Sequence, residues 1–373
     1  MPGLILILEL AAIAIVFAGL PLFYLWKKPG YSLFQKLNWI LVFMTFDLIV
    51  FGAFTRLTDS GLGCPDWPGC YGTSNPFHAL SDIQQAESAL PTGPVTVLKA
   101  WIEMIHRYLA MTVGALILVQ VGLAFSKLKS LGNKPLLGSL GLLLLVCIQG
   151  AFGAWTVTLK LQPIIVTIHL MLALVLLACL TAYAQQAWEQ KLSTVRAIRI
   201  RPLSAQLLLL AFIVLSIQVF LGAWVSTNYA VLACPDFPTC LGSAWPETNW
   251  SEGFTLWRQL GLNAQGESIS PVSLQTIHWA HRLFAVLVFI VLGSLGVRAI
   301  QLATPVLSGL SQIAKLLLGL LLLQVLTGIS NVVFQWPLLA ALLHTAGSAA
   351  LVFCLVRMSY WASWKPFIQK KMA

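Results

Sequence analysis

The chain has 373 residues, of which 58% are hydrophobic and only 9% are charged. Soluble domains carry charges at about a quarter of their positions, so this composition excludes a water-soluble fold. The apolar runs are also long and continuous, whereas the strands of a membrane barrel are short and alternate in polarity. The sequence therefore predicts an all-α polytopic membrane protein.

Nine segments are long and apolar enough to cross a bilayer, which requires about 20 residues in a helix. In chain order these predicted spans are roughly residues 3–25, 37–57, 98–124, 135–158, 164–187, 204–226, 273–298, 313–334 and 338–361. The first span is as hydrophobic as a signal peptide, but it has neither a basic start nor a small-residue cleavage site. We therefore expect it to remain as an extra N-terminal helix, in residues 1–30.

The net charge of +10 is explained by the tendency of cytoplasmic loops to collect Lys and Arg, so it does not indicate nucleic-acid binding. With the N-terminus outside, the inner loops and tail hold fifteen Lys and Arg residues and the outer loops hold four. This orientation places two long loops, roughly 58–97 and 227–272, outside and makes residues 362–373 a cytoplasmic tail. No Arg-rich amphipathic leader is present, which favours a bacterial plasma (inner) membrane over a mitochondrial one.

The sequence contains an internal duplication. His106 and His281 are 175 residues apart, and so are His169 and His344. The segments "GAFTRLTDSGLGCPDWPGC" and "GAWVSTNYAVLACPDFPTC" also match, at a separation of 170 residues. The 175-residue offset relates two further pairs, Gln149 with Gln324 and Gly153 with Gly328.

This repeat predicts two tandem four-helix bundles in the same membrane orientation, in residues 33–190 and 200–361. Four-helix bundles build cofactor sites from side chains on facing helices. Polar side chains that lie at one depth within a unit are therefore candidates for a cofactor site.

Each unit carries two histidines at similar depths in the membrane. Counted from the outer ends of their spans at about 1.5 Å per residue, His106 and His169 lie roughly 12 and 8 Å deep. His281 and His344 repeat this arrangement. Two imidazoles at one level can bind the iron of a haem from both sides, which we prefer to hydrogen bonding between helices, a zinc site or a proton relay.

Two arginines and one carboxylate accompany the histidines. Arg107 and Arg282 directly follow a predicted ligand, where each can contact a haem propionate or a nearby carbonyl, or extend to the membrane surface. Three residues before each His-Arg pair, the first unit has Glu103 and the second has His278. A buried carboxylate can act as an acid or base, so Glu103 is the predicted catalytic residue, and a structural pair with Arg107 is the alternative.

Four of the seven cysteines form two similar loops on the predicted outer side. Because that side is oxidising, we expect disulfides between Cys64 and Cys70 and between Cys234 and Cys240. They are either structural bridges or reducible pairs that exchange with a thioredoxin-like partner. A zinc site across both loops is less consistent with the spacing.

The segments "GAFTRLTDSGLGCPDWPGC", "EMIHR", "HWAHR", "VTIHLML" and "ALLHTAG" resemble the haem A synthase family over roughly residues 38–360. The resemblance implies oxidation of the methyl group at ring position 8 of haem O to a formyl group, which gives haem A for terminal oxidases. It implies that His106 and His169 hold the substrate haem O, that His281 and His344 hold a haem b, and that Glu103 is essential. It also implies a haem O synthase as a partner in the pathway.

The main alternative is a di-haem b-type membrane electron-transfer subunit. That function accounts for the four histidines equally well. It does not account for Glu103 opposite His278, for the two cysteine loops, or for ligands that all lie on one side of the membrane.

Overall fold

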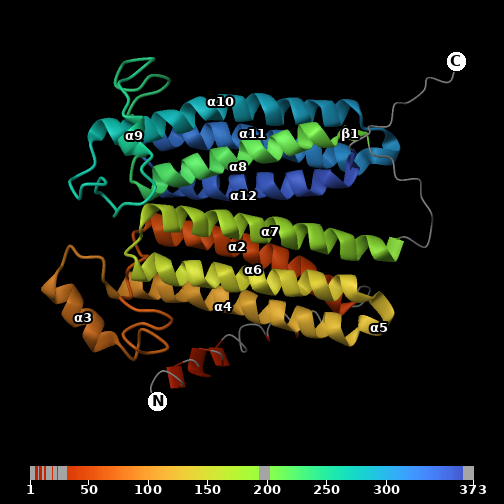
Figure 1. Ribbon diagram of the computed structural model, residues 1–373, viewed down its shortest axis with the longest axis horizontal. Coiled ribbons are helices and arrows are strands. Elements are labelled where there is room, and N and C mark those ends of the chain that lie inside the picture. Colours follow the sequence, from red (N-terminus) through yellow and green to blue (C-terminus); the bar gives the residue numbers. More distant parts are fainter. Residues whose placement is uncertain are drawn as a thin grey trace. The chain divides into compact units, whose positions relative to one another are not determined.

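The computed structural model describes residues 32–192 and 202–363, together with scattered residues among the first 31 (Figure 1). Most of the predicted first span, 3–25, and nearly all of the predicted tail, 362–373, lie outside the described residues. Within the first span, Leu10 is described and is buried in a cluster that includes Cys64 and Cys70.

Eight helices of the described part are long and apolar enough to cross a membrane. They confirm the all-α membrane fold, and each covers one of the last eight predicted spans. The eight long helices are α2 (Leu33–Leu57), α4 (Val97–Ser126), α6 (Asn133–Thr158), α7 (Pro163–Leu192), α8 (Ala205–Thr227), α10 (Pro271–Gln301), α11 (Ser308–Val333) and α12 (Leu338–Met358).

The remaining elements are short. The first long loop contains α3 (Leu80–Ala89), and the second contains α9 (Trp250–Gly253). A single turn, α5 (Leu128–Leu131), precedes α6, and 3-10 turns η1 (Pro305–Leu307) and η2 (Ser359–Trp361) lie at helix ends. Strand β1 (Leu203–Ser204) pairs in parallel with β2 (Ala362–Ser363).

The chain divides into two compact units, Met1–Ala184 and Gln185–Ala373. In the first unit, α4 packs against both α2 and α6. In the second unit, α10 packs against α8 and α11, and α12 packs against the same two helices. Helices α10 and α12 are therefore diagonal across their bundle, which is the arrangement that lets side chains from both meet in the centre.

Side-chain caps explain where several long helices begin. Ser32 and Gln35 form a capping box at the start of α2. The hydroxyls of Thr96, Ser204 and Ser270 accept backbone N–H groups at the starts of α4, α8 and α10. These caps satisfy N–H groups that have no partner within the helix, so polar residues mark the helix starts in an otherwise apolar sequence.

Candidate haem-binding sites

The second unit brings its two predicted ligands together. His281 on α10 and His344 on α12 have ring centroids 6.4 Å apart. An iron atom bound at about 2 Å by one nitrogen of each ring separates the centroids by about 6 Å. The side chains therefore fit a haem held between two imidazoles.

The first unit has the corresponding pair on α4 and α7. His106 and His169 are close enough for an electrostatic interaction between their rings. The Nδ1 atom of each is buried and has no hydrogen-bond partner in the described part of the chain. Buried polar atoms normally have partners, so two neighbouring imidazoles whose Nδ1 atoms have none also fit a site for an iron-containing ring.

A glycine on a neighbouring helix lies against each of the four imidazoles. A Cβ atom added at Gly222 would lie 2.9 Å from Cε1 of His281, and one added at Gly52 would lie 3.0 Å from Cε1 of His106. The equivalent distances are 3.3 Å for Gly153 with His169 and 3.4 Å for Gly328 with His344. The absence of a side chain at these positions leaves room for the ring of each predicted ligand.

Three of the four glycines follow a glutamine by four residues. Gln149, Gln218 and Gln324 each donate a side-chain N–H to the backbone carbonyl of the adjacent histidine, at 3.0, 3.2 and 3.0 Å respectively. These bonds hold the histidine backbones against the neighbouring helices. Before Gly52 the equivalent residue is Leu48, so the backbone carbonyl of His106 has no such amide opposite it.

Glu103 lies in a polar network at the start of α4. Its side chain is 3% exposed, and its Oε1 atom accepts a hydrogen bond of 2.5 Å from Nη2 of Arg107. Its Oε2 atom accepts a bond of 2.9 Å from the backbone N–H of Cys64. Burying an isolated charge costs several kcal/mol, and here Arg107 offsets that cost as the cationic partner of the carboxylate.

His278 occupies the equivalent place in the second unit. Its Nε2 atom accepts a hydrogen bond of 3.2 Å from Nε of Arg282, and its Nδ1 atom is buried without a partner in the described residues. Arg282 donates from Nη2 to the carbonyl of Cys234 at 2.6 Å. The two units therefore share the arginine but differ in the charge of the group beside it.

Both predicted disulfides, Cys64–Cys70 and Cys234–Cys240, are present and are confirmed. Each closes a small loop whose carbonyls converge on one arginine. Arg107 donates to the carbonyls of Asp66, Pro68 and Gly69. Arg282 donates to the carbonyls of Asp236 and Thr239 as well as Cys234. The arginine side chains thus contact neighbouring carbonyls, one of the three contacts that the sequence left open for them.

An aspartate closes the turn after each disulfide. Asp66 accepts the backbone N–H groups of Tyr71 and Gly72, at 2.6 and 2.7 Å. Asp236 accepts those of Leu241 and Gly242, at 2.6 and 2.9 Å. The Thr239 hydroxyl, followed by the Gly242 N–H, lowers the pKa of Asp236 to about 2. The ionised carboxylate of Asp236 is therefore part of the structure of its loop.

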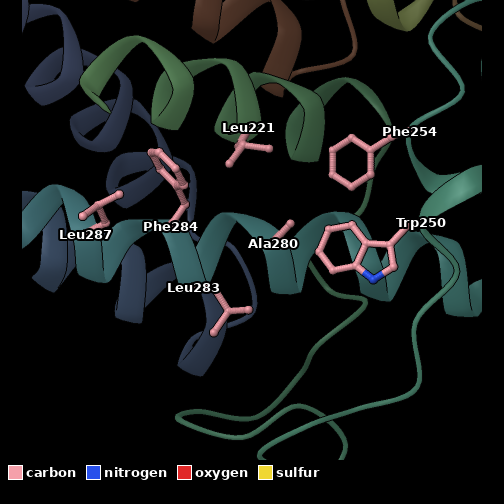
Figure 2. Close-up of a pocket in the computed structure, with 7 residues that line it drawn as sticks. All are labelled: Leu221, Trp250, Phe254, Ala280, Leu283, Phe284 and Leu287. Atoms are coloured by element: carbon pink, nitrogen blue, oxygen red, sulfur yellow. The ribbon is translucent and has the colours of Figure 1, made fainter. Parts of the chain in front are cut away.

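A pocket of about 540 Å³ lies on the second unit, lined by residues of α8, α9 and α10 and by Phe254 (Figure 2). Leu221, next to Gly222, and Ala280, next to His281, form part of its lining, and Trp250 and Phe254 lie near its end. All the lining side chains are apolar, and none is an acid, a base or a metal ligand. The pocket therefore suits a hydrocarbon group rather than a chemical step.

The sequence did not predict that the glycines and glutamines contact the histidines, or that Glu103 accepts a hydrogen bond from the backbone of Cys64. Part of the signal was visible, because Gln149 with Gln324 and Gly153 with Gly328 share the offset of the histidines. Their contacts could not be predicted from the sequence, because each of these residues contacts a histidine on a different helix.

Comparison with known proteins agrees with this arrangement. The family model described as cytochrome oxidase assembly protein, COX15-CtaA, matches residues 35–356. A haem A synthase of Shewanella oneidensis is 37% identical over 332 residues, which cover 88% of this chain and 97% of that protein. The chain belongs to the haem A synthase family. Two more haem A synthases are similar, from Beijerinckia indica (30% identical; 83% of this chain, 87% of that protein) and Caulobacter vibrioides (27%; 84% and 91%).

Membership of the haem A synthase family accounts for more of the structure than the electron-transfer alternative does. A di-haem subunit needs the four histidines, and nothing in that function calls for the disulfide loops or the buried Glu103 beside one pair. The match to haem A synthases extends over both units, so it includes all four histidines and both loops.

Proposed function

We propose that this protein oxidises the methyl group at ring position 8 of haem O to a formyl group and so produces haem A. The observation that carries the proposal is the 6.4 Å separation of the His281 and His344 rings, in a chain of the haem A synthase family. At this separation, one iron atom can be bound by a nitrogen of each imidazole. The duplication supplies a second such pair, so one unit can hold a substrate and the other a cofactor.

In this proposal His106 and His169 hold the substrate haem O, and His281 and His344 hold a haem b. The argument for this assignment is the acid-base group beside each pair. Glu103 lies three residues, about one helical turn, before His106, and its carboxylate can accept a proton although Arg107 binds one oxygen. In the second unit that place holds His278, whose Nε2 lone pair already accepts the N–H of Arg282. When bound, haem b supplies one-electron redox chemistry.

The reaction converts a methyl group into an alcohol, then into an aldehyde hydrate that loses water. Each of the two oxidations adds the oxygen of one water molecule and releases two electrons and two protons, and the electrons pass to an external one-electron acceptor. Glu103 accepts the methyl proton or positions the water that traps the oxidised carbon. Arg107 and the Cys64 N–H hold the carboxylate in place through one oxygen each, and each oxygen has a further lone pair to accept a proton or a water.

The same proposal extends to topology and partners. In a bacterial plasma membrane, the distribution of Lys and Arg supports an orientation with both disulfide loops on the outer side and the C-terminus in the cytoplasm. The substrate is expected from a haem O synthase. A thioredoxin-like protein is the expected reductant if the disulfides cycle between oxidised and reduced forms.

The decisive test compares Glu103→Gln with His278→Gln in cells that make haem O. We expect Glu103→Gln to bind haem but to form almost no haem A, because the proton acceptor is lost. His278→Gln is the matched control, since it alters the equivalent position of the other unit, and it should retain haem A formation. Extraction and mass analysis of the bound haems measure both outcomes. Full haem A output from Glu103→Gln contradicts the proposed role.

Haem extraction from the wild-type protein tests the function itself. Haem b together with haem O or haem A supports the synthase. Haem b alone, in both units, contradicts it and supports electron transfer.

A further inference from the structure

Thr327 contacts the ring of His344 directly. Its Oγ1 atom lies 2.9 Å from Nδ1 of His344 and 2.7 Å from the carbonyl of Leu323, one turn earlier in α11. The hydroxyl has one hydrogen, which it donates to that carbonyl, so its oxygen accepts the Nδ1–H of the histidine. This leaves Nε2 of His344 without a hydrogen, in the form that binds a metal.

The first unit has no such contact. At the offset of 175 residues, the equivalent of Thr327 is Phe152, which precedes Gly153 as Thr327 precedes Gly328. The benzyl side chain cannot accept a hydrogen bond at that place. In agreement, Nδ1 of His169 is buried and has no partner in the described residues.

His281 and its counterpart His106 also differ in their neighbours, but through a donor group and not an acceptor. Gln218 of the second unit places its amide nitrogen 3.2 Å from Nδ1 of His281. Its equivalent in the first unit is Leu48, and Nδ1 of His106 has no partner among the described residues. An amide N–H donates and cannot accept the Nδ1–H of a histidine, so Gln218 contacts the His281 ring without making it a more basic ligand. Of these two contacts, only that of Thr327 offers an acceptor to Nδ1.

When the remote N–H of a histidine ligand donates to an acceptor, the hydrogen bond orients the ring and raises its basicity toward the metal. Removing such a partner lowers metal affinity by about 10- to 100-fold. A cofactor has to stay through many turnovers, whereas a substrate has to enter and its product has to leave. The Thr327 contact thus lies in the unit where retention is needed, and its equivalent is missing in the unit where exchange is needed.

We propose that Thr327 is the positioning residue that makes His344 a tightly held haem ligand, and that Phe152 leaves His169 a weaker ligand from which haem exchanges. This inference rests on the proposed haem ligation by the four histidines. It adds a structural reason why one duplicated site holds a cofactor and the other turns over a substrate.

The test uses the full-length protein purified with its resident haem, and Thr327→Val, which keeps the side-chain shape but removes the hydroxyl. Two properties are measured, the rate of haem transfer to excess apomyoglobin and the midpoint potential of the resident haem. We expect transfer to become faster by on the order of tenfold. We expect the potential to become more positive, because a less basic imidazole stabilises ferric iron less.

Two matched variants separate the hydroxyl from its packing. Thr327→Ser keeps the hydroxyl and should restore both properties. Thr181→Val removes a buried hydroxyl that likewise bonds a carbonyl one turn earlier, that of Leu177 at 2.7 Å, and should change neither. The reverse variant, Phe152→Thr, should slow the transfer of haem O from the first unit.

The outcomes distinguish this inference from the proposed function. Wild-type transfer and potential in Thr327→Val overturn the role of Thr327, and so does a failure of Thr327→Ser to restore them. If His344→Ala keeps its full haem content, the ligation itself is wrong and the proposed function fails with it. Loss of haem in His344→Ala with no effect of Thr327→Val removes only this inference.

Discussion

The two units of the chain repeat the same set of contacts around their paired histidines. Each histidine has a glycine beside its ring, and each disulfide loop encloses an arginine. The units differ in the residues that touch these groups. The three differences are Glu103 for His278, Leu48 for Gln218 and Phe152 for Thr327.

The two units therefore share the shape of the histidine site but differ in the polar side chains that contact it. Glycines and disulfide loops set where a flat ring can fit, and this requirement is common to both units. Hydrogen bonds around a ligand set how tightly iron is held and which acid-base group is near it. The following experiments test whether the two units really differ in this way.

The largest effect is expected from removing a ligand. His281→Ala should abolish the bound haem b, whereas His106→Ala should abolish only the binding of haem O, because each imidazole supplies an axial bond to a different haem. Mass analysis of the extracted haems measures both. His78→Ala changes an exposed loop histidine and is the control, with wild-type haem content expected. Loss of the same haem in both ligand variants contradicts the division between the units.

The next largest effect is expected at the two arginines. Arg107→Gln leaves the buried carboxylate of Glu103 without its cation, which typically costs about 3–5 kcal/mol. Arg282→Gln removes hydrogen bonds to carbonyls and to His278 but leaves no buried carboxylate unpaired, so we expect about 2 kcal/mol.

Thermal unfolding followed by tryptophan fluorescence in detergent measures this difference. The double variant Glu103→Gln with Arg107→Gln should recover part of the loss, since no unpaired charge remains. Equal melting temperatures for Arg107→Gln and Arg282→Gln contradict the electrostatic difference between the units.

A smaller, graded effect is expected at the glycines. Gly222→Ala places a methyl group 2.9 Å from His281, and overpacking of this kind costs about 1–3 kcal/mol. Gly328→Ala, at 3.4 Å from His344, should cost less. Gly319→Ala is the control on α11, because nothing lies within 4 Å of its added methyl. Haem content after purification should decrease in the order Gly319→Ala, Gly328→Ala, Gly222→Ala, and a different order contradicts the packing.

The smallest effect concerns pH. Folding lowers the pKa of Asp236 from its ordinary 3.8 to about 2, chiefly through the Thr239 hydroxyl. The resulting stabilisation is complete above the unfolded value and is lost as the pH falls toward 2. Asp236→Asn should therefore flatten the melting temperature between about pH 5 and pH 2. The carboxylate is exposed to solvent, so the change should be small, and identical pH profiles contradict it.

The sequence predicted the elements of the fold well because each span is a local property. For example, the span predicted at 98–124 corresponds to α4 (Val97–Ser126), since a membrane helix needs a continuous apolar segment of sufficient length. The histidine pairs and the disulfides were also predictable, because the duplication makes them stand out at fixed offsets.

The contacts between helices were not predictable in the same way. Nothing in the sequence around Thr327 indicates His344 as its partner, because the contact depends on how α11 and α12 are rotated against each other. The same holds for Glu103, whose partner Cys64 lies 39 residues earlier in a loop. Long-range hydrogen bonds of this kind are set by packing and not by local pattern.

By itself, the sequence determined that this is a duplicated helical membrane protein with two pairs of buried histidines. The bilayer imposes length and apolarity on every span separately, so the pattern can be read one segment at a time. Only the tertiary structure decided that α10 and α12 face each other diagonally and that one unit surrounds its ligands with polar partners. Those features depend on helix packing, in which a few ångströms decide whether a hydroxyl meets an imidazole.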